Sequence, residues 1–120
     1  MKTFVVGDIH GAYKALLQCL ESSSFNYKND RLVVMGDVCD GYPDVVECFN
    51  ELLKLKHLTY IWGNHDKWAY DFYTGVTGGY AEPFWIKQGG AATFDGYAKI
   101  GGMPADHIKI LKNAHVALEE

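Results

Sequence analysis

The chain is 120 residues long, with 48% hydrophobic and 22% charged residues and a formal net charge of −4. This length and composition suit one globular domain with a single core, over residues 1–120, and they exclude a disordered chain. The acidic balance indicates neither a nucleic-acid surface nor an anionic membrane surface. No apolar run is long enough to cross a bilayer, and the three cysteines lack CxxC spacing, so we expect a cytoplasmic location.

Short apolar runs predict three buried strands, at residues 3–6, 32–35 and 58–62. Between them, apolar residues recur at helical spacing, which predicts one amphipathic helix from Tyr13 and a second beginning near Pro43. Strands and helices alternate with short connections, so the sequence predicts an α/β fold with a parallel sheet built from two βαβ units.

The second half of the chain predicts a short helix over 67–74 and then a long segment, 75–102, rich in glycine and aromatic residues. Such a segment is typical of a functional loop or lid. Its aromatic side chains either line a substrate groove or pack the lid, and the sequence leaves both interpretations open. Pro104 begins a last predicted helix, whose apolar stripe is Ile108, Leu111, His115 and Leu118.

Several histidines and cysteines are not expected to act in metal binding or catalysis. His107 and His115 lie eight residues apart in a helical pattern, so surface or interface positions are expected rather than metal ligation. Cys19 and Cys48 fall within helical patterns and are expected in the core. Cys39 lies in a turn, which allows it to be exposed.

Polar turns follow all three predicted strands: Gly7-Asp8-Ile9-His10-Gly11, Gly36-Asp37-Val38-Cys39-Asp40-Gly41 and Gly63-Asn64-His65-Asp66. From His10 to Asp37 is 27 residues, and from Asp37 to Asn64 is 27 again. Because parallel strands have their carboxyl ends at one edge of a sheet, we expect the side chains of these turns to converge there.

Four of these side chains are suitable metal ligands: Asp8, His10, Asp37 and Asn64. Carboxylate, imidazole and amide groups suit Mn²⁺, Fe and Zn²⁺. An aspartate can bridge two cations, and two metals roughly 3.5–4 Å apart can clamp a phosphoryl group and activate a water. Two dications would also attract a phosphate ester to an acidic chain. These residues therefore favour a divalent-metal site suited to phosphate esters.

In strict order, the three turns resemble the GDxHG, GDxxDRG and GNH[DE] motifs of the calcineurin-like metallophosphoesterases. The resemblance is to the phosphoprotein phosphatase branch, which includes bacterial and phage serine/threonine phosphatases. It covers roughly the first 66 residues, and the later Trp85, Thr93 and Tyr97 also resemble bacterial and phage members. It implies half of that family's two-sheet sandwich: a parallel βαβαβ unit, an aromatic and glycine-rich loop region, and a C-terminal helix.

The resemblance also implies a dinuclear metal site. Asp8 and His10 would bind a first metal. Asp37 would bridge it to a second, which Asn64 would also bind. The ions would be Mn²⁺ in the first place, with Fe or Zn²⁺ as alternatives.

Two further motif residues would act in catalysis. His65 would be the general acid that protonates the leaving oxygen, and Asp40 would hydrogen-bond His65, fix its tautomer and stabilise its protonated form. The implied reaction is direct attack of a metal-bound hydroxide on a phosphate ester, without a phosphoenzyme.

The sequence departs from the family in two places. Gly41 replaces the arginine of the second motif, so a bidentate phosphate donor is missing. The C-terminal histidine motifs of the family have no counterpart here, so we expect an N-terminal part of a metallophosphoesterase. The second metal then has only Asp37 and Asn64, and at most one weakly bound ion is expected in this chain alone.

The leading functional hypothesis is a phosphatase that acts on a phosphorylated protein or a small phosphoester, inactive as it stands if its site is incomplete. Two alternatives stay open: a non-catalytic fragment that acts as a binding or assembly module, and a nucleotide polyphosphate hydrolase. The absent second sheet would leave apolar surface exposed and favour self-association. The sequence assigns no residue to substrate binding.

Overall fold

The computed structural model describes residues 1–78 and 81–115. Its centre is a three-stranded parallel sheet in the order β1 (Thr3–Val6), β2 (Arg31–Val34) and β3 (His57–Tyr60). Val6 pairs with Val34, and Val34 with Tyr60, so the three strands end in register. The predicted α/β fold and its parallel βαβαβ order are therefore confirmed, and the three polar turns leave the sheet at one edge.

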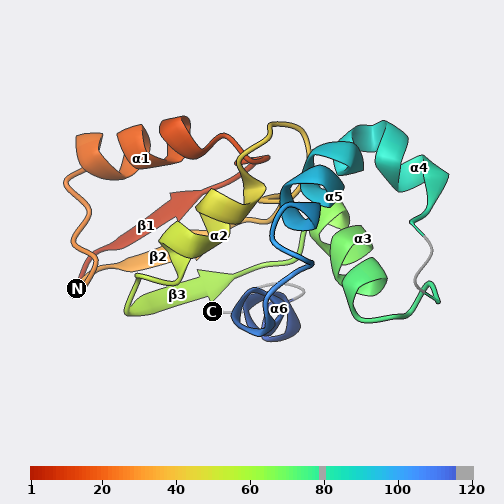
Figure 1. Cartoon of the computed structure of the whole chain (residues 1–120). Coiled ribbons are helices and arrows are strands. Elements are labelled where there is room, and N and C mark those ends of the chain that lie inside the picture. The colour runs from red at the N-terminus through yellow and green to blue at the C-terminus, as the bar shows by residue number, and fades with distance from the viewer. Residues whose placement is uncertain (79–80, 116–120) are drawn as a thin grey trace.

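Helices α1 (Tyr13–Ser22) and α2 (Val45–Leu52) connect the strands and lie on the same side of the sheet (Figure 1). Helix α2 is more deeply buried than α1. Four of its side chains have no exposed surface: Val45, Cys48, Phe49 and Leu52. Each large apolar side chain buried in this way contributes about 1.5–3 kcal/mol. This packing holds the central strand β2, and with it the second polar turn, in place.

After β3, the described part of the chain contains α3 (Asn64–Tyr73), α4 (Pro83–Trp85), α5 (Ala91–Ala98) and α6 (Ala105–Lys112), with a π-helical turn η1 (Ile86–Gly90) joining α4 to α5. The prediction of a loop over 75–102 is therefore wrong for residues 83–98. Gly89, with φ of 102°, marks a kink between two helices. Trp85 and Tyr97 are 2% and 0% exposed, and their burial in the core holds this region in a helical form.

The last predicted helix is shorter than expected, because α6 ends at Lys112. His115 instead lies beside β3. Its N–H donates to the Tyr60 carbonyl at 2.8 Å, and its carbonyl accepts from the Trp62 N–H at 2.8 Å. The helical position predicted for His115 is thus wrong, and Leu118 lies outside the described residues.

His107 is 1% exposed, so the surface position predicted for it is wrong. Its Nδ1 lies 2.8 Å from the Tyr97 hydroxyl and its Nε2 lies 2.7 Å from Asn50 Oδ1. A neutral ring satisfies both contacts, and burial lowers the pKa of His107. The cysteine assignments also change: Cys39 is fully buried, and Cys19 is exposed and not in the core.

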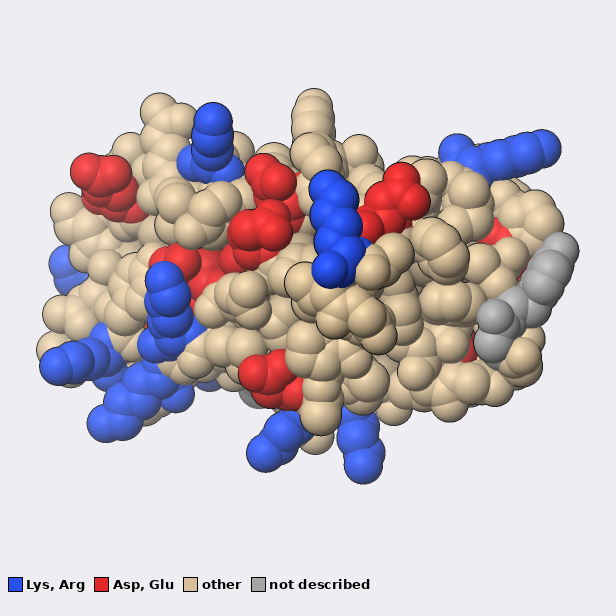
Figure 2. All heavy atoms as spheres, viewed as in Figure 1, with Lys and Arg blue, Asp and Glu red and all other residues tan. Residues whose placement is uncertain are grey.

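No helix within the described residues is long and apolar enough to cross a membrane. On the face drawn in Figure 2, several acidic side chains lie across the upper middle and several basic side chains gather toward the lower left.

Candidate active site

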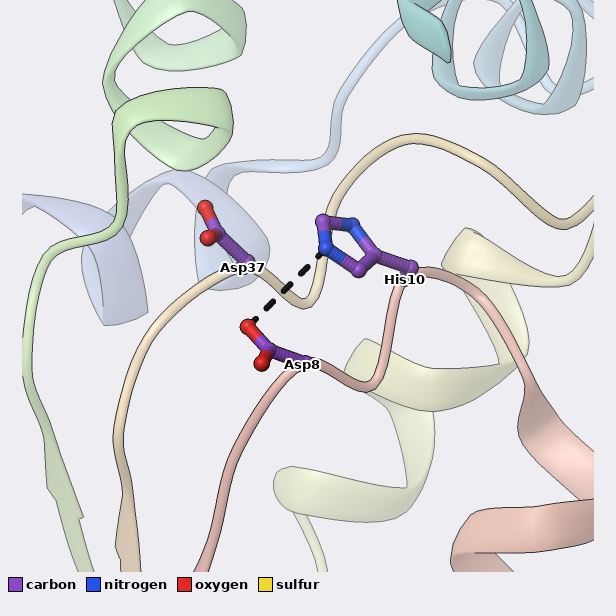
Figure 3. Close-up of side chains that lie close together, drawn as sticks. All are labelled: Asp8, His10 and Asp37. Atoms are coloured by element: carbon purple, nitrogen blue, oxygen red, sulfur yellow. Dashed lines mark ion pairs between the residues drawn. The ribbon is translucent and has the colours of Figure 1, made fainter.

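Asp8, His10 and Asp37 converge at the carboxyl edge of the sheet (Figure 3). One ligand atom from each side chain lies within 4.8 Å of the other two. Asp8 and His10 come from the turn after β1, and Asp37 comes from the turn after β2. The expected convergence is therefore present for the first two turns, and we call these three residues the carboxylate–histidine cluster.

The backbone of the cluster is held in a conformation that is uncommon outside glycine. The φ angles of Asp8, His10 and Asp37 are 51°, 47° and 55°. Asp40 follows with φ of 73°. Each such residue costs free energy, and such residues concentrate at functional sites. A hydrogen bond of 2.8 Å from the His10 N–H to the Asp37 carbonyl fastens the first turn to the second and helps to hold this geometry.

His10 is oriented by a hydrogen bond from its own ring. Its Nδ1 lies 3.0 Å from the carbonyl oxygen of Cys39. Because a carbonyl only accepts, Nδ1 carries the proton, and Nε2 keeps a free lone pair. That Nε2 lies 4.0 Å from Asp8 Oδ1. The second ring nitrogen of a metal-binding histidine is typically held in this way.

Asp37 lies where β2 and β3 end side by side. Its Oδ1 accepts a hydrogen bond of 3.1 Å from the backbone N–H of His65. A Cβ atom at position 63 would overlap the Asp37 carboxylate, so glycine is required at this position. Among the described residues, Oδ2 has no hydrogen-bond donor, so its lone pairs are available to a cation.

The donor set fits a divalent ion. Two carboxylates and an imidazole with a fixed tautomer are ligands that Mn²⁺, Fe and Zn²⁺ accept. The Asp8 side chain is 81% exposed, so the cluster is open to solvent ions. Asn64, the fourth predicted ligand, is exposed at the first position of α3.

Asp66 holds the backbone of the second and third turns through hydrogen bonds, a role that was not predicted from the sequence. It is 0% exposed, and its carboxylate accepts four backbone N–H groups, from Asp37 at 2.7 Å, Val38 at 3.1 Å, Cys39 at 3.2 Å and Gly63 at 3.1 Å. Burial raises the pKa of Asp66, while its backbone hydrogen bonds act in the opposite direction. Asp66 therefore ties the second turn to the third.

Asp40 and His65 form the expected pair, with His65 Nδ1 2.8 Å from Asp40 Oδ2. Asp40 is 0% exposed and accepts two further hydrogen bonds, from Trp85 Nε1 at 2.8 Å and Thr93 Oγ1 at 2.6 Å. Burial raises the pKa of the Asp40 carboxyl, and its side-chain hydrogen bonds act in the opposite direction. The arrangement leaves Nε2 as the ring nitrogen of His65 that faces away from Asp40.

Trp85 and Thr93 were recognised in sequence only as part of a resemblance. They lie 45 and 53 residues after Asp40, so no local spacing connects them to it. The helical folding of residues 83–98 brings both to Asp40. Together with Asp66, we call Asp40, Trp85 and Thr93 the buried network.

Two aromatic rings lie close to the ring of His65. The His10 ring lies with its centroid 5.1 Å away, and the Trp68 ring lies 5.0 Å away. Helix α3 begins at Asn64, three residues before the predicted start, so His65 lies in its first turn. The pair of His65 and Asp40 thus adjoins the carboxylate–histidine cluster.

Gly41 stands where the resembled motif has arginine. Its φ is 100°, and a Cβ there would lie 3.1 Å from His10 Cβ, so any side chain at position 41 would be strained. The chain has a single arginine, Arg31, which opens β2 at the opposite end of the sheet. A phosphate at this edge is therefore not bound by an arginine of this chain.

A parallel βαβαβ unit whose carboxyl edge carries a group of residues that could hold a divalent metal, with the His65 ring beside it, fits the metallophosphoesterase class. The sequence profile of the calcineurin-like phosphoesterases matches residues 1–115. The chain belongs to this family.

Two curated relatives illustrate the range of the family. The chain is 42% identical over 67 residues to the symmetrical bis(5'-nucleosyl)-tetraphosphatase of Buchnera aphidicola subsp. Acyrthosiphon pisum (strain Tuc7), covering 55% of this chain and 24% of that protein. It is 34% identical over 87 residues to serine/threonine-protein phosphatase 1 of Salmonella typhimurium, covering 72% of this chain and 38% of that protein. The chain thus spans well under half the length of these relatives.

A solved structure shares the fold. The crystal structure of a cold-active protein-tyrosine phosphatase from a psychrophilic Shewanella species matches with a TM-score of 0.61 at 18% identity. The match covers 93% of this chain and 37% of that one.

Proposed function

We propose that this protein is a metal-dependent phosphoester hydrolase with a dinuclear site. The observation that carries the proposal is the cluster of Asp8, His10 and Asp37, whose ligand atoms lie within 4.8 Å of one another, with the His65 ring beside His10. Membership of the calcineurin-like phosphoesterases supports it. Bound divalent ions would polarise the phosphoryl group and activate the attacking water.

In this proposal the cluster binds the metals unequally. Asp8, His10 and Asp37 give the first ion three protein donors, which is the usual number for a catalytic metal. Asp37 and Asn64 give the second ion two, so we expect it to bind more weakly. A donor set dominated by oxygen favours Mn²⁺.

His65 is proposed as the general acid. The hydrogen bond to Asp40 fixes Nδ1, so Nε2 would donate the proton to the leaving oxygen. Asp40 is a positioning residue, because it is fully buried and acts through His65. Trp85 and Thr93 hold the Asp40 carboxylate and thereby set the direction of the His65 ring.

Hydrolysis of a generic aryl phosphate in the presence of Mn²⁺ tests this function. We expect His65→Gln to lower kcat by about 10²-fold or more, since a general acid typically contributes that much. His57→Gln is the matched control and should keep full activity, because His57 is a half-buried histidine that opens β3, at the end of the sheet opposite the cluster. Equal activity of the two variants would contradict the assignment.

Metal binding provides a second test that does not require turnover. Calorimetric titration of this chain with Mn²⁺ should show at most one bound ion, and Asp8→Asn should weaken its binding by about tenfold or more. Asp95→Asn, at an exposed position in α5, is the control and should bind as the parent does. Parental Mn²⁺ affinity in Asp8→Asn would remove Asp8 from the ligand set.

We also propose that the protein self-associates through the sheet. Val5 is 65% exposed and Met35 is 51% exposed, which leaves apolar surface near the end of β1 and β2. Light scattering should give a mass above that of one chain, and Val5→Lys should reduce it. A monodisperse monomer would contradict this proposal without affecting the assigned site.

A further inference from the structure

A cavity of about 310 Å³ lies between α3 and the chain entering α4. Its lining residues are Trp68, Asp71, Phe72, Thr77, Glu82, Phe84 and Trp85. Of these residues, only Trp85 takes part in the proposed hydrolase site, through its hydrogen bond to Asp40. Its volume is at the lower end of the range for small-molecule sites.

The cavity adjoins His65 through Trp68. The ring of Trp68 forms one wall and lies 5.0 Å from the His65 ring. The other neighbour of that ring is His10, which belongs to the cluster. If His65 protonates the leaving oxygen, the cavity is next to the residue that contacts the leaving group.

The walls of the cavity are suited to a flat ring. The rings of Trp68 and Phe84 lie 5.3 Å apart at an interplanar angle of 83°, so they present surfaces at nearly a right angle. Phe72 and Trp85 add two more rings, 5.6 Å apart. Stacking on aromatic side chains is the usual way in which proteins bind nucleobases without regard to sequence.

The polar groups of the cavity are mostly acceptors. The carboxylates of Asp71 and Glu82 accept hydrogen bonds, and Thr77 Oγ1 is buried without a partner among the described residues. Among the described residues, the lining includes no lysine, arginine or histidine that would attract an anionic group. The occupant therefore carries N–H donors and no negative charge in this part of the molecule.

Two chemical groups meet these conditions: an amino-bearing aromatic ring and an aliphatic cation. Lys67 Nζ lies 3.3 Å from Asp71 and offsets its charge, and Glu82 is exposed to solvent, so attraction for a cation is weak. The four aromatic rings are therefore the main feature of the cavity walls, and they favour an occupant that stacks on them over an aliphatic cation.

We propose that this cavity binds a nucleobase of the substrate, next to His65. The proposal rests on the proposed function for the position of the phosphate, but the cavity itself is formed by the protein alone. Nucleobase binding therefore does not depend on metal or on turnover.

The test uses metal-free protein and adenosine, which has a nucleobase and no phosphate. Adenosine should quench the tryptophan fluorescence saturably, and Phe84→Leu should weaken its binding by about tenfold. Phe84 is 62% exposed, so this variant should fold normally. Tyr42→Leu is the matched control, because Tyr42 is 63% exposed and does not line the cavity.

A second variant checks the wall next to His65. Trp68→Leu should reduce adenosine binding in equilibrium dialysis, a measurement that does not need the lost fluorophore. Parental binding in both Phe84→Leu and Trp68→Leu, no binding by the parent, or tighter binding of arginine than of adenosine would each overturn the proposal. Failure of aryl phosphate hydrolysis would bear on the proposed function alone.

Discussion

The site contains two sets of carboxylates with opposite surroundings. In the carboxylate–histidine cluster, Asp8 is 81% exposed in its side chain and Asp37 is half-buried. In the buried network, Asp40 and Asp66 have no exposed surface and accept hydrogen bonds from backbone or side-chain donors. Asp37 and Asp40 belong to the same turn, only three residues apart.

The difference indicates a division of labour. A carboxylate that keeps free lone pairs and solvent access can bind a cation, whereas a carboxylate whose oxygens are occupied by N–H and O–H donors orients its neighbours. Substitutions in the cluster should therefore affect metal binding and activity, and substitutions in the buried network should affect stability first.

The largest expected loss of stability is for Asp66→Ala. Four backbone N–H groups would lose their acceptor in a buried place, which costs about 4 kcal/mol and lowers the melting temperature by roughly 15 °C. Thermal unfolding by circular dichroism measures this, with Asp95→Ala as the exposed control. A loss of less than about 1 kcal/mol would mean that the buried network does not support the turns.

The opposite behaviour is expected of Asp37→Asn. Asparagine keeps the shape, tolerates a positive φ and still accepts the hydrogen bond from the His65 N–H, so the melting temperature of the metal-free protein should not fall. Loss of the charge should lower Mn²⁺-dependent hydrolysis by about 10²- to 10³-fold. If Asp37→Asn destabilised the protein as much as Asp66→Ala does, the proposed distinction between the carboxylate–histidine cluster and the buried network would be wrong.

A smaller change, Thr93→Val, examines how far the buried network controls the catalytic pair. Thr93 Oγ1 donates to Asp40 Oδ1 and accepts from the Asp40 N–H at 2.7 Å, so its removal should cost about 2 kcal/mol. Activity should fall about tenfold, because Asp40 orients His65. Thr74→Val, at an exposed position, is the control. A shifted pH–rate profile with unchanged KM would distinguish mispositioning of His65 from simple unfolding.

The smallest expected effect concerns pH and lies outside both sets. Because burial lowers the pKa of His107, the unfolded chain binds a proton before the native protein does as the pH falls. The contribution of neutral His107 is therefore fully present above the ordinary histidine pKa of about 6.5 and decreases as the pH falls through that value towards the native pKa. The melting temperature should fall more between pH 8 and pH 5 in the parent than in His107→Gln, and equal falls would contradict this.

Much of the candidate site could be predicted because its proposed metal ligands directly follow strands. An apolar strand that ends in Gly-Asp specifies both the turn and the edge of the sheet at which the aspartate lies, so Asp8 and Asp37 were brought to one edge by local pattern alone. The buried network could not be predicted in the same way. Trp85 and Thr93 reach Asp40 because residues 83–98 fold into helices. The many glycine and aromatic residues of that segment had predicted a loop instead.

The burial of His107 and of Cys39 could not be predicted from the sequence either. Whether a histidine on an amphipathic helix is buried depends on which other helices pack against it, and here Asn50 of α2 and Tyr97 of α5 supply its partners. Cys39 lies in a turn, but the turn is covered by the helical region that follows β3, so its side chain is fully buried.

By itself, the sequence determined the parallel βαβαβ order, the family and the residues at the carboxyl edge, because hydrophobic periodicity and strand-end motifs are local properties. Only the tertiary structure decided which carboxylates are open and which are enclosed, and that an aromatic cavity lies beside His65. Burial and hydrogen bonding between segments far apart in the chain decide such differences, and no spacing in the sequence encodes them.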